Sequence, residues 1–167
     1  RDRIHRALEG LPKAQEAKKS AEAKEQARVS TTDPEARVMK MADGGFRPAW
    51  NIQIASDTRS RIIAAVSVDN RGSDRGNLDA IVTQIRARTG RTPEEILADG
   101  GYVDHDDIVA IADKGVKPYI PLSSNKKSVA PHIPKPGDPP AVAEWRQRMT
   151  TEDAKSVYKQ RAATAES

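Results

Sequence analysis

The sequence predicts a mixed α/β fold in which helices pack on a sheet that begins with two antiparallel strands. Hydrophobic and polar residues alternate over Trp50–Ala55, and a polar turn at 57–60 separates them from the β-branched run Ile62–Val68. Two such segments joined by a short turn are typical of a hairpin. Strand-like and helix-like segments then alternate, as in sheets covered by helices. The 167 residues suffice for one domain with a hydrophobic core.

The segment after the hairpin favours an amphipathic helix that Gly90 ends and that Ser73 or Asp74 caps. Its apolar residues have the spacing i, i+3, i+4, i+7, which forms one helix face: Leu78, Ile81, Val82 and Ile85. A short apolar strand, Ile96–Ala98, is expected next.

A second helix is expected to begin at the cap Asp104 and to end at Gly115, with Ile108 and Ile111 facing inward. The segment Val116–Ile120 is predicted to be a strand, and because it contains Pro118 we expect it at the edge of the sheet. A long loop, 121–140, precedes a short helix over 141–149 and a last helix that Thr150 or Thr151 caps and that runs to Glu166.

The first 28 residues predict a polar helical arm, and residues 29–167 the main domain. The arm has eight basic and five acidic residues, with only alanines as an apolar face over Lys13–Arg28. This composition favours a solvated or docked helix; the alternative is a DNA-contacting arm that uses Lys18, Lys19 and Lys24. Residues 29–48, with Asp33-Pro34 and Gly44-Gly45, are expected to form a connector.

The overall composition excludes several classes of protein. The net charge is 28 − 24 = +4, which favours a polyanionic partner. No cysteine is present, so disulfides, thiolate zinc sites and a cysteine nucleophile are excluded. No apolar run approaches the length of a membrane span, and no signal peptide opens the chain, so we expect a cytoplasmic protein without a membrane partner. Because the first residue is Arg1, we expect a piece of a longer protein.

Asp99 is the most informative candidate for a functional site. It follows a short apolar strand and precedes Gly100-Gly101, at the strand end where open α/β sheets place functional side chains. The glycines would let a metal or a phosphate approach the carboxylate. A structural role, in which Asp99 only caps the turn, fits the residues as well.

The last helix carries Tyr158, Arg161 and Glu166 near one face. A tyrosine, an arginine and a glutamate on one side of a helix can surround a charged ligand. Periodicity alone favours a solvated helix end with an Arg–Glu pair.

Residues 99–113 contain five aspartates, a composition that suits Mg²⁺. Three of them, Asp104, Asp106 and Asp107, fall in a helix first turn, where acids suit the helix dipole, and we assign them to capping. The three histidines form no zinc pattern.

A basic loop and helix form the second expected polyanion contact. Residues 116–148 have six basic residues against two acidic ones, although a solvated loop would show the same bias. The candidates for DNA contact here are Lys126, Lys127, Arg146 and Arg148.

Four motifs, in order, resemble DDE-type transposases of bacterial insertion sequences. They are Ser30–Arg37, Phe46–Gln53, Ala98–Tyr102 and the series Tyr158, Arg161, Glu166. The likeness runs from about Arg28 to the end of the chain.

The resemblance implies an RNase H-like domain with a sheet of strand order 3-2-1-4-5. It also implies an enzyme that cleaves phosphodiesters and transfers DNA strands, using Mg²⁺ or Mn²⁺ held by three carboxylates. Asp99 matches the second carboxylate and Glu166 the third. Tyr158 and Arg161 match residues expected at DNA near the cut. The implied partners are transposon-end and target DNA, and a second copy of the chain in a synaptic complex at the bacterial nucleoid.

Two departures from the family pattern point to a truncated domain. No Asp-Gly-Thr-like motif supplies the first carboxylate, and the chain stops one residue after Glu166. Without its first strand, the hairpin and the strand at Ile96–Ala98 would lack the partner between them. The alternative functions are therefore an inactive fragment that binds nucleic acid or full-length subunits, and a helical interaction module built on residues 1–28.

Overall fold

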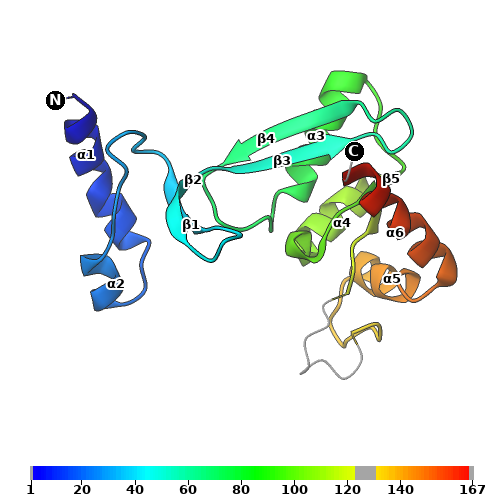
Figure 1. Cartoon of the computed structure of the whole chain (residues 1–167). Coiled ribbons are helices and arrows are strands. Elements are labelled where there is room, and N and C mark those ends of the chain that lie inside the picture. The colour runs from blue at the N-terminus through cyan, green and yellow to red at the C-terminus, as the bar shows by residue number, and fades with distance from the viewer. Residues whose placement is uncertain (1, 123–130, 166–167) are drawn as a thin grey trace. The chain divides into compact units, whose positions relative to one another are not determined.

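The computed structural model describes residues 2–122 and 131–165, and the chain divides into two compact units (Figure 1). The first unit comprises residues 1–52 and 68–72, and the second comprises residues 53–67 and 73–167. No helix in the described part is long and apolar enough to cross a bilayer.

The first unit holds two helices and a hairpin. Helix α1 spans Asp2–Glu16, and the short α2 spans Ala21–Glu25. Strands β1 (Arg37–Lys40) and β2 (Phe46–Ala49) pair antiparallel. The sequence predicted only a connector here, which is wrong for these two strands. Gly44 has a φ of 81°, which a glycine adopts without strain, and so allows the tight turn between them.

The predicted hairpin at 50–68 is confirmed. Strands β3 (Asn51–Ser56) and β4 (Ile63–Asp69) pair with each other, and the short link between them requires an antiparallel arrangement. Asp57 organises the turn, because its Oδ1 accepts hydrogen bonds from the backbone N–H and the hydroxyl of Ser60. Its N–H donates to the carbonyl of Ile62 at 2.9 Å, which closes the loop.

The second unit contains the main hydrophobic core. Its helices are α3 (Leu78–Thr89), α4 (His105–Asp113), α5 (Pro140–Arg148) and α6 (Glu152–Ala165). Apolar side chains from α3, α4, α5 and the β5–β6 region form one buried cluster: Leu78, Val82, Ala98, Ile108, Ile111, Val116, Ile120, Val142 and Trp145. The predicted inward faces of α3 and α4 supply much of this cluster.

The observed N-terminal cap of α4 is the predicted one, whereas that of α3 differs from the prediction. Asp104 accepts from the N–H groups of Asp106 and Asp107 at the start of α4, as predicted. Neither Ser73 nor Asp74 caps α3. The Leu78 N–H instead donates to Oδ2 of Asp107 at 2.9 Å, so Asp107 joins α4 to α3. Burial raises the pKa of this carboxyl.

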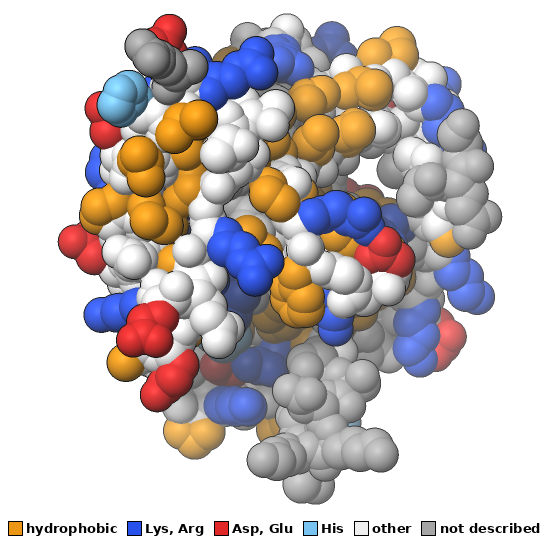
Figure 2. All heavy atoms as spheres, turned by 60° about the vertical axis from the view of Figure 1, so that its left-hand side comes forward, with side chains coloured by type: hydrophobic (Ala, Val, Ile, Leu, Met, Phe, Trp, Pro, Cys, Tyr) orange, Lys and Arg blue, Asp and Glu red, His pale blue; other side chains and the backbone are white. Residues whose placement is uncertain are grey.

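The strands form three separate two-stranded sheets in the described ranges, and not one mixed sheet. Strands β5 (Glu95–Leu97) and β6 (Lys117–Tyr119) pair parallel, with Ile96 opposite Pro118. Because β6 pairs on one side only in this sheet, Pro118 is tolerated as predicted. Several hydrophobic side chains of the β3–β4 hairpin are exposed, among them Ile54, Ile62 and Ile63, and Figure 2 shows hydrophobic side chains reaching the surface among charged ones.

A buried ion pair ties the end of the loop region, just before α5, to α5 itself. Arg146 Nε donates to Oδ2 of Asp138 at 2.7 Å, and both side chains are only 8% exposed. The N–H of Lys135, with Arg146 adding to it, holds the pKa of the Asp138 carboxyl below its ordinary value. A depressed pKa stabilises the fold above the unfolded-state pKa of about 3.9, and this contribution disappears as the pH falls through the folded-state pKa.

We therefore expect Asp138→Asn to unfold at a lower temperature than the wild type at pH 7, with the difference shrinking below about pH 4. The measurement is the unfolding temperature between pH 3 and pH 7, followed by circular dichroism. A difference that stays constant over this range would show that the Asp138 carboxylate does not contribute through its charge.

Candidate functional site

The site predicted at Asp99 lies where the parallel β5–β6 pair ends. The N–H of Ala98 donates to the carbonyl of Tyr119 at 3.1 Å, which continues the pairing to the residue before Asp99. Oδ1 of Asp99 then accepts from the N–H of Gly101 at 2.8 Å and caps a short 3₁₀ turn, Gly100–Tyr102. The structural role that the sequence allowed for Asp99 is thus present, and the carboxylate remains 45% exposed.

Helix α6 brings a second predicted residue to this carboxylate. Arg161 Nη2 lies 3.1 Å from Oδ2 of Asp99, although 62 residues separate the two along the chain. A carboxylate offers about four lone-pair positions. The bonds from Gly101 and Arg161 occupy two of them, so the exposed carboxylate keeps capacity for a further ligand. Tyr158, one turn earlier on α6, is half-buried.

The electrostatics at this strand end are set by two carboxylates and one guanidinium. Burial raises the pKa of Tyr102 to about 12, and the nearby charges of Asp74 and Asp99 add to the effect while Arg161 opposes it. Tyr102 therefore stays protonated near neutral pH. Among the described residues, the negative charges that act on Tyr102 here are those of Asp74 and Asp99.

Several predicted residues lie outside the described ranges. These are Glu166, Lys126 and Lys127, and α6 is described up to Ala165, directly before Glu166. In the ranges that are described, no three histidine, aspartate or glutamate side chains are grouped as a metal site.

The two predicted basic residues of α5 have partners within the fold. Arg146 bonds Asp138 and donates to the carbonyl of Pro131 at 2.8 Å, and its side chain is buried. Arg148 pairs with Glu144 at 2.7 Å and is 18% exposed. Of these two side chains, Arg148 is the one exposed enough to contact a phosphate from outside the protein.

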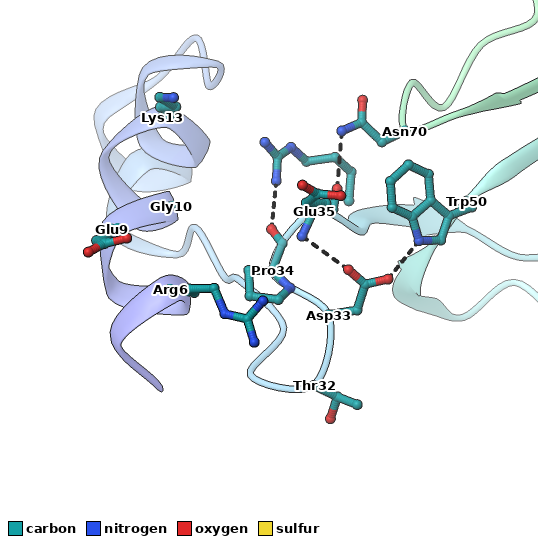
Figure 3. Close-up of a pocket in the computed structure, with 11 residues that line it drawn as sticks. Arg6, Glu9, Gly10, Lys13, Thr32, Asp33, Pro34, Glu35, Trp50 and Asn70 are labelled. Carbon is teal, nitrogen blue, oxygen red and sulfur yellow. Dashed lines mark hydrogen bonds between the residues drawn. The ribbon is translucent and has the colours of Figure 1, made fainter. Parts of the chain in front are cut away.

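A groove in the first unit offers a different environment (Figure 3). It has a volume of about 580 Å³ and is lined by α1 and by the segment that follows residue 31. Trp50 Nε1 donates to Oδ2 of Asp33 at 2.7 Å, and the Asn70 amide donates to the carbonyl of Glu35. Arg6, Lys13 and Arg37 are matched there by an equal number of acids, so the groove has no excess charge that would select a polyanion.

Sequence reasoning missed Asp74, which lies near Asp99 at Gly101, and Gln53, which contacts Asp74. Asp74 was considered only as a helix cap, and Gln53 only as a polar position of the hairpin and the last residue of the motif Phe46–Gln53; neither was predicted as a site residue. A Cβ placed on Gly101 would lie 3.0 Å from Oδ2 of Asp74 and 2.9 Å from Oδ1 of Asp99. The Gln53 amide nitrogen donates to Oδ1 of Asp74 at 3.1 Å. No periodicity signal connects three segments so far apart in sequence.

In this α/β chain an exposed carboxylate at the end of a strand thus faces an arginine from a later helix. The family model described as Transposase DDE domain matches residues 15–166, and the chain belongs to this family. Neither the curated proteins nor the solved structures that were compared contain a match. The family match covers both Asp99 and the whole described length of α6, and it confirms the resemblance seen in the four motifs.

Proposed function

We propose that this chain supplies part of the reaction centre of a DNA transposase that cleaves phosphodiesters at transposon ends and transfers the freed strand to target DNA. Asp99 and Glu166 are the two metal-binding carboxylates that we assign to this chain. The observation that carries the proposal is the contact between Asp99 and Arg161, because it brings the strand end and the last helix to one place.

The residues at the strand end fit a hard divalent cation such as Mg²⁺ or Mn²⁺. Such ions prefer carboxylate oxygens and keep several waters, and Asp99 offers an exposed carboxylate beside the backbone of Gly101. When bound, divalent cations generate a nucleophile from water or a 3′-hydroxyl and stabilise the leaving oxygen of an in-line displacement. Asp99 would hold one such ion, with Glu166 as a second ligand.

The residues of α6 would position the DNA backbone at that carboxylate. The Arg161 guanidinium has donors beyond the one that faces Asp99, and a planar guanidinium suits phosphate oxygens. We assign Arg161 to the phosphate next to the cut, with Tyr158 on the same helix side. Lys126, Lys127 and Arg148 would add phosphate contacts that give affinity without sequence specificity.

The RNase H-like sheet order is also part of this proposal. The β3–β4 hairpin and the β5–β6 pair are separate two-stranded sheets, and in an RNase H-like domain one further strand lies between such pairs. That strand would also provide the first catalytic aspartate.

The second candidate function is DNA or subunit binding without cleavage by these 167 residues alone. It is favoured by the same separation of the two strand pairs. A reaction centre whose residues come from several strands requires those strands to pair in one continuous sheet. In this case the chain would act only together with a full-length subunit that contributes the intervening strand, as in a synaptic complex.

One experiment tests both functions. Two proteins are compared: one expressed from the whole reading frame that contains this sequence, and the 167-residue chain alone. Each is incubated with DNA that carries the genomic sequences on both sides of that reading frame, where the transposon ends are expected. We expect the first to cut only when Mg²⁺ or Mn²⁺ is present, and to lose this activity with EDTA. We expect the second to bind DNA without cutting, with affinity falling at least about tenfold between 50 and 200 mM salt.

Absence of metal-dependent cutting by the first protein would overturn the transposase reaction. Cutting by the 167-residue chain would contradict the second candidate.

A further inference from the structure

Two carboxylates from different segments meet at Gly101 in the second unit. Because one point, the Cβ position of Gly101, lies 2.9 Å from Oδ1 of Asp99 and 3.0 Å from Oδ2 of Asp74, these two oxygens are at most 5.9 Å apart. Gly101 has no side chain to fill the space between them. Two oxygens that both bind one Mg²⁺ lie within about 4.2 Å, twice the usual Mg–O distance of about 2.1 Å. A small rotation of either side chain, or one bridging water, therefore suffices.

A buried amide holds Asp74 in this position. Gln53 is only 2% exposed, and its Nε2 donates to Oδ1 of Asp74 at 3.1 Å. The other end of the same amide, Oε1, accepts no hydrogen bond from any residue in the described ranges. Buried acceptors without a donor are rare in native proteins, where ordered water or an ion's hydration shell commonly satisfies them.

The charge at this place favours a cation. The side chains of Asp74 and Asp99 both act on Tyr102 as nearby negative charges. Arg161 provides one positive group, on the Oδ2 side of Asp99. Oδ2 of Asp74 lies close to the same point as Oδ1 of Asp99, and Tyr102 nearby stays protonated because its pKa is raised to about 12 by burial, with both aspartates adding to the effect.

We propose that Asp74 and Asp99 together bind a divalent cation across Gly101, and that Gln53 positions Asp74 while its Oε1 accepts a hydrogen bond from a water of that cation. This inference rests on the proposed function and adds Asp74 to the reaction centre as a ligand. The ligand class is a small, hard cation, Mg²⁺ or Mn²⁺, because all of the protein atoms offered are oxygens.

The test is Mn²⁺ binding to the 167-residue chain, followed by the loss of the electron paramagnetic resonance signal of free Mn²⁺. We expect Asp74→Asn and Asp99→Asn each to weaken binding by about tenfold or more, while Asp106→Asn stays within about twofold of the wild type. Asp106 is a matched control because it is an exposed aspartate of the same unit, in the first turn of α4. Circular dichroism shows whether each variant is folded.

A second variant keeps the test decisive if Asp74→Asn does not fold. Gly101→Ala places a methyl group 2.9 Å and 3.0 Å from the two carboxylate oxygens, so these side chains must shift and the methyl group fills the space beside them, without removing a charge. We expect it to weaken Mn²⁺ binding as strongly as the charge removals do. Undiminished binding in either Asp74→Asn or Gly101→Ala would overturn the inference.

The two proposals fail in different ways. If Asp99→Asn abolishes DNA cleavage by protein expressed from the whole reading frame while Asp74→Asn binds Mn²⁺ normally, the inference is wrong and the transposase reaction stands. A wild-type chain that binds Mn²⁺ no better than Asp99→Asn would likewise overturn the inference, because both carboxylates are contained in this chain.

Discussion

Replacing Asp99 with asparagine in protein expressed from the whole reading frame is expected to lower DNA cleavage at least about a thousandfold, or about 4 kcal/mol of transition-state stabilisation. Asparagine keeps an oxygen that can accept from the Gly101 N–H, as Oδ1 of Asp99 does at 2.8 Å. The local turn is therefore retained. The negative charge that would hold the cation, and that faces Arg161, is lost.

The measurement is the rate of strand cleavage with saturating Mg²⁺, compared with that of Asp106→Asn. Asp106 is exposed and lies in the first turn of α4, so its variant should cut at nearly the wild-type rate. If Asp99→Asn cuts within about threefold of the wild type, Asp99 holds no catalytic cation, and its role is limited to capping the turn.

Truncation of Trp145 to alanine is expected to destabilise the second unit by about 3–5 kcal/mol. Trp145 is 1% exposed in the core cluster, and its Nε1 donates to the carbonyl of Ile120 at 3.1 Å. The variant would leave a cavity between α5 and β6 and a buried carbonyl without its donor, and both effects lower the free energy of unfolding. Because Ile120 follows β6, the loss should also loosen the strand pair that positions Asp99.

Urea unfolding followed by far-ultraviolet circular dichroism measures this effect without relying on the fluorescence of the removed tryptophan. Ile133→Ala is the control, since Ile133 is 55% exposed and its removal should change stability by no more than about 0.5 kcal/mol. A loss below about 1 kcal/mol for Trp145→Ala would contradict the core as described.

Much of the fold follows from local patterns in the sequence. The spacing of apolar residues predicted α3 and α4, because one stripe of a helix must face the core. Gly90, with a φ of 71°, ends α3 as expected. The hairpin β1–β2 was missed, because its strands are four residues long and β2 contains Pro48. Short strands of this kind depend on their partner and carry little signal of their own.

The candidate site could be predicted only in part. Asp99 and Arg161 were found because motifs mark them, and their contact at 3.1 Å joins two of those motifs. Asp74 and Gln53 were missed because their proximity to Asp99 arises from the packing of three segments, which periodicity does not encode. Arg146 was predicted as a DNA contact from charge alone, and composition could not show that Asp138 would bury it.

In the proposed reaction centre, the end of β5 and the end of the last helix meet at one cation. Iron-directed cleavage tests this most directly: Fe²⁺ replaces Mg²⁺, ascorbate generates hydroxyl radicals at the bound ion, and mass spectrometry locates the backbone cuts. A cation held at both ends predicts cuts beside Asp99 and beside Glu166, with a further group beside Asp74 as its additional ligand, all suppressed by excess Mg²⁺. Cuts beside Asp99 with none near Glu166 would contradict this arrangement.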